Sequence, residues 1–415
     1  MKKKFLLLIL LVFLIVSCGE TTGEKPENKG LAGFRVEFVD FDCGSEENRV
    51  EIPEEVKINI TALGYDNKPL TDYNGDVEID MLYGDNKAVV KKSIVNGYAK
   101  NVTVKMRNCL DKDRVVVQEK RKGGKSGDYT GKMGVSPFVY TNFATISAIQ
   151  SAVNDDSGSS PLYGSHFDKR NLTLKASKGK KMVVIAVIEG GFYLQEVDSD
   201  NGDAGDYSSI YMYTYSTPYV DDNIEEPMSL QVGTVIESAN GSVYEFSGFT
   251  EMSFPTFKPK YDENGKIVVD KSLVPKKGKG IKDVTGFLPD PQKTSKENAD
   301  SHYEMEKYEA SLVTVKNVFV DEFLEDDSSF ADYSQFPLTV SAGSDVSPLR
   351  TITAQTVYTA PLFDPVKEKE QNQKPETKKC YNFTGVLKQH NSAQSTWIIV
   401  PRDMDDIEPV ECKEK

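Results

Sequence analysis

The sequence predicts an all-β protein made of several modules. Short runs in which apolar and polar residues alternate dominate the chain, and Gly, Asn, Asp or Pro separate them. Almost no segment repeats its apolar residues with the period of a helix. The 415 residues are enough for two to four domains. We therefore expect β-rich modules in series rather than a helical or mixed fold.

The first residues have the composition of an export signal. Three lysines precede an apolar stretch, 5–16, that is too short to cross a membrane comfortably. Residues 15–18, Ile-Val-Ser-Cys, resemble a bacterial lipobox, in which the cysteine after a small residue is lipidated. The resemblance implies that residues 1–17 are removed, that acyl chains such as palmitate on Cys18 anchor the protein to a membrane, and that residues 18–30 form a flexible tether. The alternative is an ordinary signal peptide in which Cys18 occurs by chance.

Export places the rest of the chain outside the cytoplasm. No other stretch is long and apolar enough to cross a bilayer, so we expect the body to be held by its lipid. Gly19 follows the cysteine, and in enteric-type sorting a residue other than Asp at this position favours the outer membrane. The expected location is the bacterial cell envelope, facing the periplasm or the cell surface.

Four cysteines remain after Cys18, and an even number in an oxidising compartment predicts two disulfides. Cys43 follows the first expected strand and Cys109 the fifth, and in an up-and-down order the turns after these strands lie at one end of a module. We therefore expect Cys43 to pair with Cys109. Cys380 and Cys412 bracket the last expected hairpin, and a bond between them would hold the C-terminus.

Residues 31–140 contain six candidate strands of alternating pattern. The segment 62–79, ALGYDNKPLTDYNGDVEI, resembles bacterial immunoglobulin-like domains, in which a polar turn and a Tyr-Asn-Gly segment lead into the third strand. The resemblance implies an immunoglobulin-like β-sandwich. It would lack the Trp that packs on the buried disulfide of antibody domains, because Trp397 is the only Trp in the chain.

Residues 141–258 carry the most extensive resemblance, to the OB-fold modules that precede the catalytic domain of secreted bacterial nucleases. The resemblance implies an OB-fold-like β-barrel. The Gly-Asp turn that usually leads into the fourth strand is absent, and VGTVIESA at 232–239 is the expected fourth strand. The matching elements occur in the order Ile-Gln at 149–150, SPLYG at 160–164, GFYLQ at 191–195, IYMY at 210–213 and GSVYEFSGFTE at 241–251.

Residues 305–415 are expected to form a second OB-fold-like unit. YEASLVTVKNVFV at 308–320 is similar to the segment that follows the first unit in the same nucleases, with Ala310 in place of the usual Gly. PRDMDDI at 401–407 is similar to their Pro-Arg-x-x-x-Asp-Ile ending. Between the two units, residues 259–304 are rich in Lys, Asp and Pro with few apolar anchors, which predicts a long, partly ordered connection along the surface.

Four aspartates crowd the loop that follows the GFYLQ element. A catalytic pair of carboxylates needs two different environments, whereas these side chains share one wet loop, so we do not expect catalysis there. A flexible loop of hard oxygens can bind Ca²⁺, the one cofactor the sequence suggests, although Ser209 stands where an EF-hand has its closing Glu. The alternative is a solvated turn between the second and third strands of the first barrel. The candidate ligands are Asp198, Asp200, Asp203 and Asp206.

Tyr211, Tyr213 and Tyr215 alternate, so on a strand they share one face. OB-folds bind ligands over this region of the sheet, and aromatic rings stack on bases or sugars. The alternative is ordinary strand composition on a face that another module covers.

The charge of the chain argues against nucleic acid as a partner. Removing the three lysines of the signal takes the formal net charge from −14 to −17, and such a body repels phosphate backbones. One basic cluster, KRKGGK at 120–125, is interrupted by glycines and is expected to be a solvated hairpin loop.

Few residues suggest an enzyme. His166, His302 and His390 are isolated in the sequence, so neither a zinc site nor a nucleophile–histidine pair is expected from them. The acidic run at 303–309 is interpreted as a solvated face. The chain ends where the nucleases place their catalytic domain, so we expect no catalytic activity.

The leading hypothesis is a non-catalytic, lipid-anchored protein of the cell envelope that binds or scaffolds an unidentified ligand. The alternative is an accessory nucleic-acid-binding protein related to the secreted nucleases. A third possibility is a metal-dependent hydrolase, which would need acidic residues and His gathered in one cleft.

Overall fold

The computed structural model is mostly β, with 50% of residues in strands and 11% in helices, which confirms the predicted fold class. Within the described residues no helix is long and apolar enough to cross a membrane. Cys18 and the export signal lie outside those residues. The structure describes residues 30–412 except 52–53, 83–88, 107–108, 121–130, 152–169, 189, 217, 221–227, 277–279, 295, 342–349, 375–376 and 391–395.

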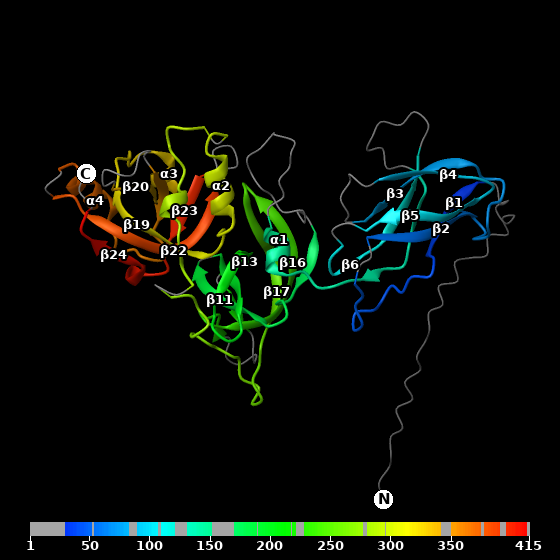
Figure 1. Ribbon diagram of the computed structural model, residues 1–415, viewed down its shortest axis with the longest axis horizontal. Helices are drawn as coiled ribbons and strands as arrows, with labels where there is room; N and C mark the ends of the chain where they lie inside the picture. Colours follow the sequence, from blue (N-terminus) through cyan, green and yellow to red (C-terminus); the bar gives the residue numbers. More distant parts are fainter. Residues whose placement is uncertain are drawn as a thin grey trace, which may run out of the picture. The chain divides into compact units, whose positions relative to one another are not determined.

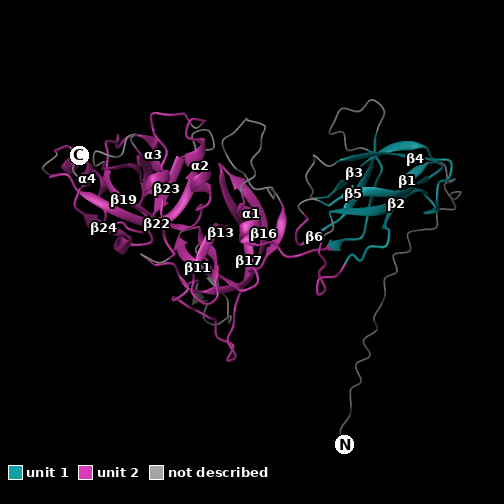
Figure 2. Cartoon of the chain, viewed as in Figure 1, with its two compact units in different colours: residues 1–43, 52–107, 113–139 teal, residues 44–51, 108–112, 140–415 magenta. Residues whose placement is uncertain are grey.

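The chain divides into two compact units (Figure 2). Unit 1 comprises residues 1–43, 52–107 and 113–139, and unit 2 comprises residues 44–51, 108–112 and 140–415. Two segments of the expected first module, 44–51 and 108–112, therefore belong to unit 2. Arg49 fixes them to each other, because its Nη1 donates to the carbonyl of Asp111 at 2.6 Å and to the Asp111 carboxylate at 2.9 Å.

Unit 1 contains two antiparallel sheets with apolar residues on one face. In β2 every second residue from Val56 to Ala62 is buried, as the alternating sequence predicts. β3 follows the same pattern at Val77, Ile79 and Met81. The relation of these sheets to immunoglobulin-like domains stays a prediction. One sheet holds β1 (Leu31–Phe38), β2 (Glu55–Gly64) and β5 (Tyr98–Lys105), the other holds β4 (Val90–Ile94), β3 (Gly75–Met81), β7 (Val115–Glu119) and β8 (Met133–Val135), and β6 (Lys112–Asp113) pairs with β9 (Val139–Tyr140).

The first barrel of unit 2 is a closed five-stranded barrel with an OB-like strand order (Figure 1, green). Its first, second and third strands are neighbours, the fifth lies parallel to the third, and the fourth closes the barrel between the fifth and the first. Its core includes Met182, Phe192 and Ile210. The strands are β11 (Lys180–Ile188), β12 (Gly191–Asp198), β13 (Ala204–Tyr213), β16 (Val235–Phe246) and β17 (Phe249–Pro259), with α1 (Ile146–Gln150), β10 (Asn171–Leu174) on β16, and the short pair β14 (Tyr219–Val220) and β15 (Met228–Ser229).

The second barrel repeats the same order of five strands (Figure 1, yellow to red). Phe336, Phe383 and Trp397 are the largest fully buried side chains of its core. The strands are β19 (Leu312–Val320), β20 (Gln335–Val340), β21 (Thr351–Gln355), β22 (Cys380–His390) and β23 (Thr396–Val400), with β18 (Lys282–Asp283) on β19 and β24 (Ile407–Val410) on β22, and the helices are η2 (Thr285–Phe287), α2 (Ala299–Glu306), α3 (Ser328–Tyr333), α4 (Pro365–Asn372) and η4 (Met404–Asp406).

The two barrels share a buried apolar layer. Tyr193 and Tyr211 of the first barrel and Leu312 and Ile398 of the second belong to one cluster of buried residues. Ala310, just before β19, is fully buried there with φ of +59°, in the left-handed region that favours glycine.

The connection between the barrels is more ordered than its composition predicts. Leu273 and Val274 are buried in the layer between the barrels, and Val284 and Leu288 are buried in the core of the second barrel. These four apolar residues are too few to form a periodic pattern, but they fasten the connection to both barrels.

The structure confirms one of the two expected disulfides. Cys380 and Cys412 are bonded, with 5.1 Å between their Cα atoms, and they hold β24 beside β22. Cys43 and Cys109 are not joined in the structure, so their pairing stays a prediction.

Candidate binding groove of the second barrel

Two adjoining clefts lie on the second barrel, with volumes of 530 and 460 Å³. Both are lined by Pro337 of β20, Thr353 of β21 and Thr396 at the start of β23. They therefore meet over the second and third strands, next to the start of the fifth. OB-folds bind extended ligands on this face, between the loops that join strands one and two and strands four and five. We call the two clefts together the β20–β21 groove.

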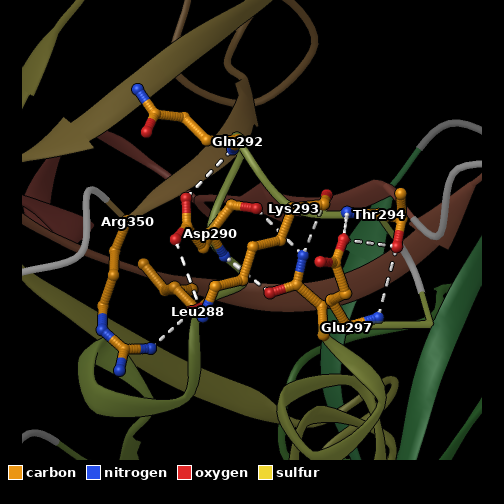
Figure 3. A network of polar contacts seen from close by, with 8 residues as sticks. Leu288, Asp290, Gln292, Lys293, Thr294, Glu297 and Arg350 are labelled. Atoms are coloured by element: carbon orange, nitrogen blue, oxygen red, sulfur yellow. Dashed lines mark hydrogen bonds and ion pairs between the residues drawn. The ribbon is translucent and has the colours of Figure 1, made fainter.

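One end of the groove is lined by a compact polar turn, and Figure 3 shows the polar contacts of this turn. The backbone N–H of Asp290 donates to Oδ1 of Asn298 at 2.9 Å, and Nδ2 of Asn298 donates back to the carbonyl of Asp290 at 2.9 Å. The Asp290 carboxylate also accepts the N–H of Gln292 at 3.0 Å. Asp290 and Asn298 are both buried, so these bonds fix the backbone of the wall.

The next turn is fixed in the same way. Oε2 of Glu297 accepts the backbone N–H of Thr294 at 2.8 Å and its hydroxyl at 2.7 Å. Arg350 reaches across from the approach to β21 and donates to the carbonyl of Leu288 at 2.5 Å. Thr294 and Lys293, which line the groove, thus stand on a backbone held at both ends.

The floor of this end is a tryptophan–histidine pair. Nε1 of Trp397 donates to Nδ1 of His302 at 3.0 Å, and both side chains are buried. Because Nδ1 accepts, the proton of the neutral imidazole is on Nε2. Burial lowers the pKa of His302 to about 4, so the ring is neutral near neutral pH. His302 is a positioning residue here and not a charged ligand.

The other end of the groove is aromatic. It is built by the segment between β19 and β20, in which Phe323 and Phe330 contact each other with 4.6 Å between ring centroids. Asp327 caps α3 by accepting the N–H of Ser329 at 2.8 Å, which fixes the helix that carries Phe330 and Tyr333. Tyr333 lines the groove and is 55% exposed, so its ring is available to a ligand.

The groove has little net charge. Lys293 lies 3.9 Å from the Asp290 carboxylate, and these two charges offset each other. The Asp327 carboxylate caps α3, and this hydrogen bond does not offset a charge. His390 also lines the groove, and burial together with the nearby charge of Lys388 lowers its pKa, which keeps it neutral. Such a surface suits a neutral, polar ligand better than a phosphate backbone.

The structure separates the three candidate tyrosines. Tyr211 is 7% exposed and packs against Tyr193 in the layer between the barrels, with 4.9 Å between their ring centroids. The second barrel therefore covers Tyr211 and a ligand cannot reach it. Tyr213 is half-buried, and Tyr215, just after β13, is 74% exposed. Their ring centroids are 6.2 Å apart. For Tyr211 the structure therefore fits the alternative reading of the sequence, in which another module covers this face of the strand.

The four aspartates of the 198–206 loop do not converge. The Asp198 carboxylate accepts the backbone N–H of Asp200 at 2.9 Å, and the N–H of Asp198 donates to the carbonyl of Asp203 at 2.9 Å, which are bonds of a turn between β12 and β13. Asp206 lies on β13 near Lys307. The hydrogen bond to Glu304 raises the pKa of Lys307, and the charge of Asp206 raises it further. Within the described ranges, no three His, Cys, Asp or Glu side chains are placed to hold a metal. The geometry is that of the solvated turn.

The interpretation of residues 303–309 as a solvated face is wrong. Glu306 and Glu309 are 5% and 2% exposed, because the end of α2 and the turn after it lie at the junction of the two barrels. Thr250 of β17 donates its N–H to Glu309 at 3.1 Å and its hydroxyl to Glu245 at 2.9 Å. Burial raises the pKa of both buried carboxyl groups, and the neighbouring carboxylates raise it further.

No protein-family model matches the sequence, and no match was found among curated proteins. The groove itself has no signal in the sequence, because its lining comes from five separate segments.

Proposed function

We propose that this chain is a non-catalytic binding protein, held at the bacterial cell envelope by lipid on Cys18, and that the β20–β21 groove is where it binds its ligand. The observation that carries the proposal is the position of the groove. Two clefts meet at Pro337, Thr353 and Thr396, on the face that OB-folds use for extended ligands.

The ligand we propose is a neutral oligosaccharide. An exposed Tyr333 and the Phe323–Phe330 pair offer ring faces to a sugar, while Thr294, Thr353 and Thr396 carry hydroxyl groups that match its hydroxyls. OB-folds bind oligosaccharides as well as oligonucleotides. The groove lacks the excess of cations that a nucleic acid requires, and the whole chain has a formal charge of −14. These two facts favour the sugar.

We also keep the proposed relations of the three β-rich modules to known families. The OB-like strand order of both barrels supports a relation to the modules of secreted nucleases, and the two sheets of unit 1 are compatible with an immunoglobulin-like sandwich. Accessory nucleic-acid binding remains the alternative function. It is disfavoured because Tyr211, which was to stack on bases, is buried.

The experiment is a calorimetric titration of the full mature chain with a panel of neutral oligosaccharides. We expect saturable binding to at least one of them, weakened about tenfold or more by Tyr333→Ala. Tyr358→Ala is the matched control, because Tyr358 is 61% exposed and lies outside both clefts. Equal losses in the two variants, or no binding across the panel, would contradict the assignment of the groove.

A further inference from the structure

A separate cleft of 510 Å³ lies on the first barrel and is lined by four lysines. Lys180 and Lys181 begin β11, Lys258 lies near the end of β17, and Lys260 follows that strand. The barrel register brings these ends together, because Ile236 of β16 is opposite both Met182 and Pro259. The lysines therefore converge through the fold and not through their order in the sequence.

Two of the four ammonium groups have a carboxylate within ion-pair distance. Nζ of Lys258 lies 2.8 Å from Glu237, which also lines the cleft. Nζ of Lys180 lies 3.6 Å from Glu196, a side chain that is 1% exposed. The charge of the cleft is thus reduced but not cancelled.

Lys181 and Lys260 have no carboxylate within ion-pair distance among the residues that the structure describes. Lys181 donates to the carbonyl of Ser199 at 3.4 Å. The hydrogen bonds from Ser272 lower the pKa of Asp270, and the nearby charge of Lys181 lowers it further. Lys260 is exposed. Like charges that are held close together repel each other. Four lysines in one cleft are therefore unusual in a chain with 64 Asp and Glu against 50 Lys and Arg.

We propose that this cleft binds a multiply charged anion of the phosphate class, at a site distinct from the β20–β21 groove. The cleft contains lysines and no arginine. The planar fork of Arg matches carboxylate and phosphate alike, whereas Lys acts on phosphate as a point charge. Several such point charges suit an anion that carries several negative charges. A volume of 510 Å³ is larger than a single phosphate needs and fits a short chain of phosphate groups.

The half-exposed ring of Tyr261 forms one wall, at 39% exposure, and adds an apolar surface beside Lys260. The phosphate groups come either from a soluble polyphosphate or from a lipid headgroup. Both present the same oxyanions to the lysines, and the experiment separates them.

The test is a calorimetric titration of the full mature chain with inorganic tripolyphosphate at about 0.15 M salt, where exposed charges are screened beyond about 8 Å. We expect saturable binding to one site. Lys258→Gln/Lys260→Gln should weaken it about tenfold or more. Lys260→Gln alone breaks no ion pair among the described residues, so it should not disturb folding. It should still weaken the binding of tripolyphosphate.

The control is Lys92→Gln/Lys367→Gln, which removes the same charge at two exposed lysines outside the cleft. Binding that is unchanged in the control and lost in the cleft variant supports the site. Equal weakening in both variants, or no saturable binding, would overturn it. A parallel titration with dihexanoyl phosphatidic acid assigns the site: tighter binding than tripolyphosphate indicates a lipid headgroup, and weaker binding indicates a soluble polyphosphate.

Discussion

The indole N–H of Trp397 donates to Nδ1 of His302 across 3.0 Å, and this bond joins the last strand of the second barrel to α2. The two residues are 95 positions apart, so the bond closes one end of the groove by linking the connection to the barrel. A buried donor that loses its acceptor costs about 1–3 kcal/mol.

We predict that His302→Leu destabilises unit 2 by about that amount, because Trp397 Nε1 is left without its acceptor. The wild type should also lose stability as the pH falls from about 6.5, the usual pKa of His, to about 4, its value in the fold. The sign follows from the lowered pKa, since the unfolded chain takes up the proton first. Urea unfolding at several pH values measures both effects. His390→Leu, which breaks no such bond, should cost less. A loss of stability between pH 6.5 and 4 that is as large in His302→Leu as in the wild type would contradict the assignment.

Glu306→Gln and Glu309→Gln should stabilise the barrel junction at neutral and higher pH. Burial raises both pKa values above about 4.3, so the carboxyl groups favour the fold below that pH and lose this contribution as the pH rises through the raised values. Gln keeps an oxygen that can accept from Thr250 and removes the repulsion. The thermal midpoint should rise by about 2–4 °C for each kcal/mol gained. Glu263→Gln, on an exposed turn, is the control, and a lower midpoint for Glu309→Gln at pH 8 would show that the carboxylate is needed.

Removing the Cys380–Cys412 disulfide should cost about 2–4 kcal/mol, because the bond closes a long loop of the unfolded chain. The paired change Cys380→Ser/Cys412→Ser is measured by urea unfolding under oxidising conditions. Of the described strands, β24 should lose the most protection against proteolysis, since it pairs with β22 alone. An unchanged midpoint would mean that the β22–β24 pairing holds the C-terminus without the bond.

Cys18→Ser should abolish acylation and release the protein from the membrane or leave an uncleaved precursor. Detergent-phase partitioning and the mass of the N-terminal peptide measure this. Partitioning equal to that of the wild type would remove the lipid anchor from the proposed function.

The sequence predicts the barrels well because their strands alternate and their motifs occur in order. VGTVIESA, expected as the fourth strand of the first barrel, overlaps the start of β16. The Asp-rich segment lies in the turn between the second and third strands, as the solvated alternative predicts. The local sequence pattern is sufficient to predict these strands and this turn, because their conformation depends on residues that are close together in the chain.

What the sequence does not predict depends on contacts between the barrels. Tyr211 and Tyr215 have the same spacing pattern, yet one is buried and the other exposed. Tyr211 lies in the layer between the barrels, whereas β13 ends at Tyr213 and Tyr215 lies beyond the strand. Glu306 and Glu309 belong to an acidic run that is typical of solvent, and their burial follows from the docking of α2. The groove is missed for the same reason, because its walls lie far apart in the sequence.

The most direct measurement of the central claim is the fluorescence of Trp397, which is the only Trp of the chain and lines the β20–β21 groove. Titration with the oligosaccharide that binds best should change its emission in a saturable way, with little dependence on salt because the ligand is neutral. The same titration should be weakened about tenfold by Tyr333→Ala and not by Tyr358→Ala. Binding that leaves Trp397 emission unchanged, or an emission change produced by single-stranded DNA and not by any neutral sugar, would contradict the account.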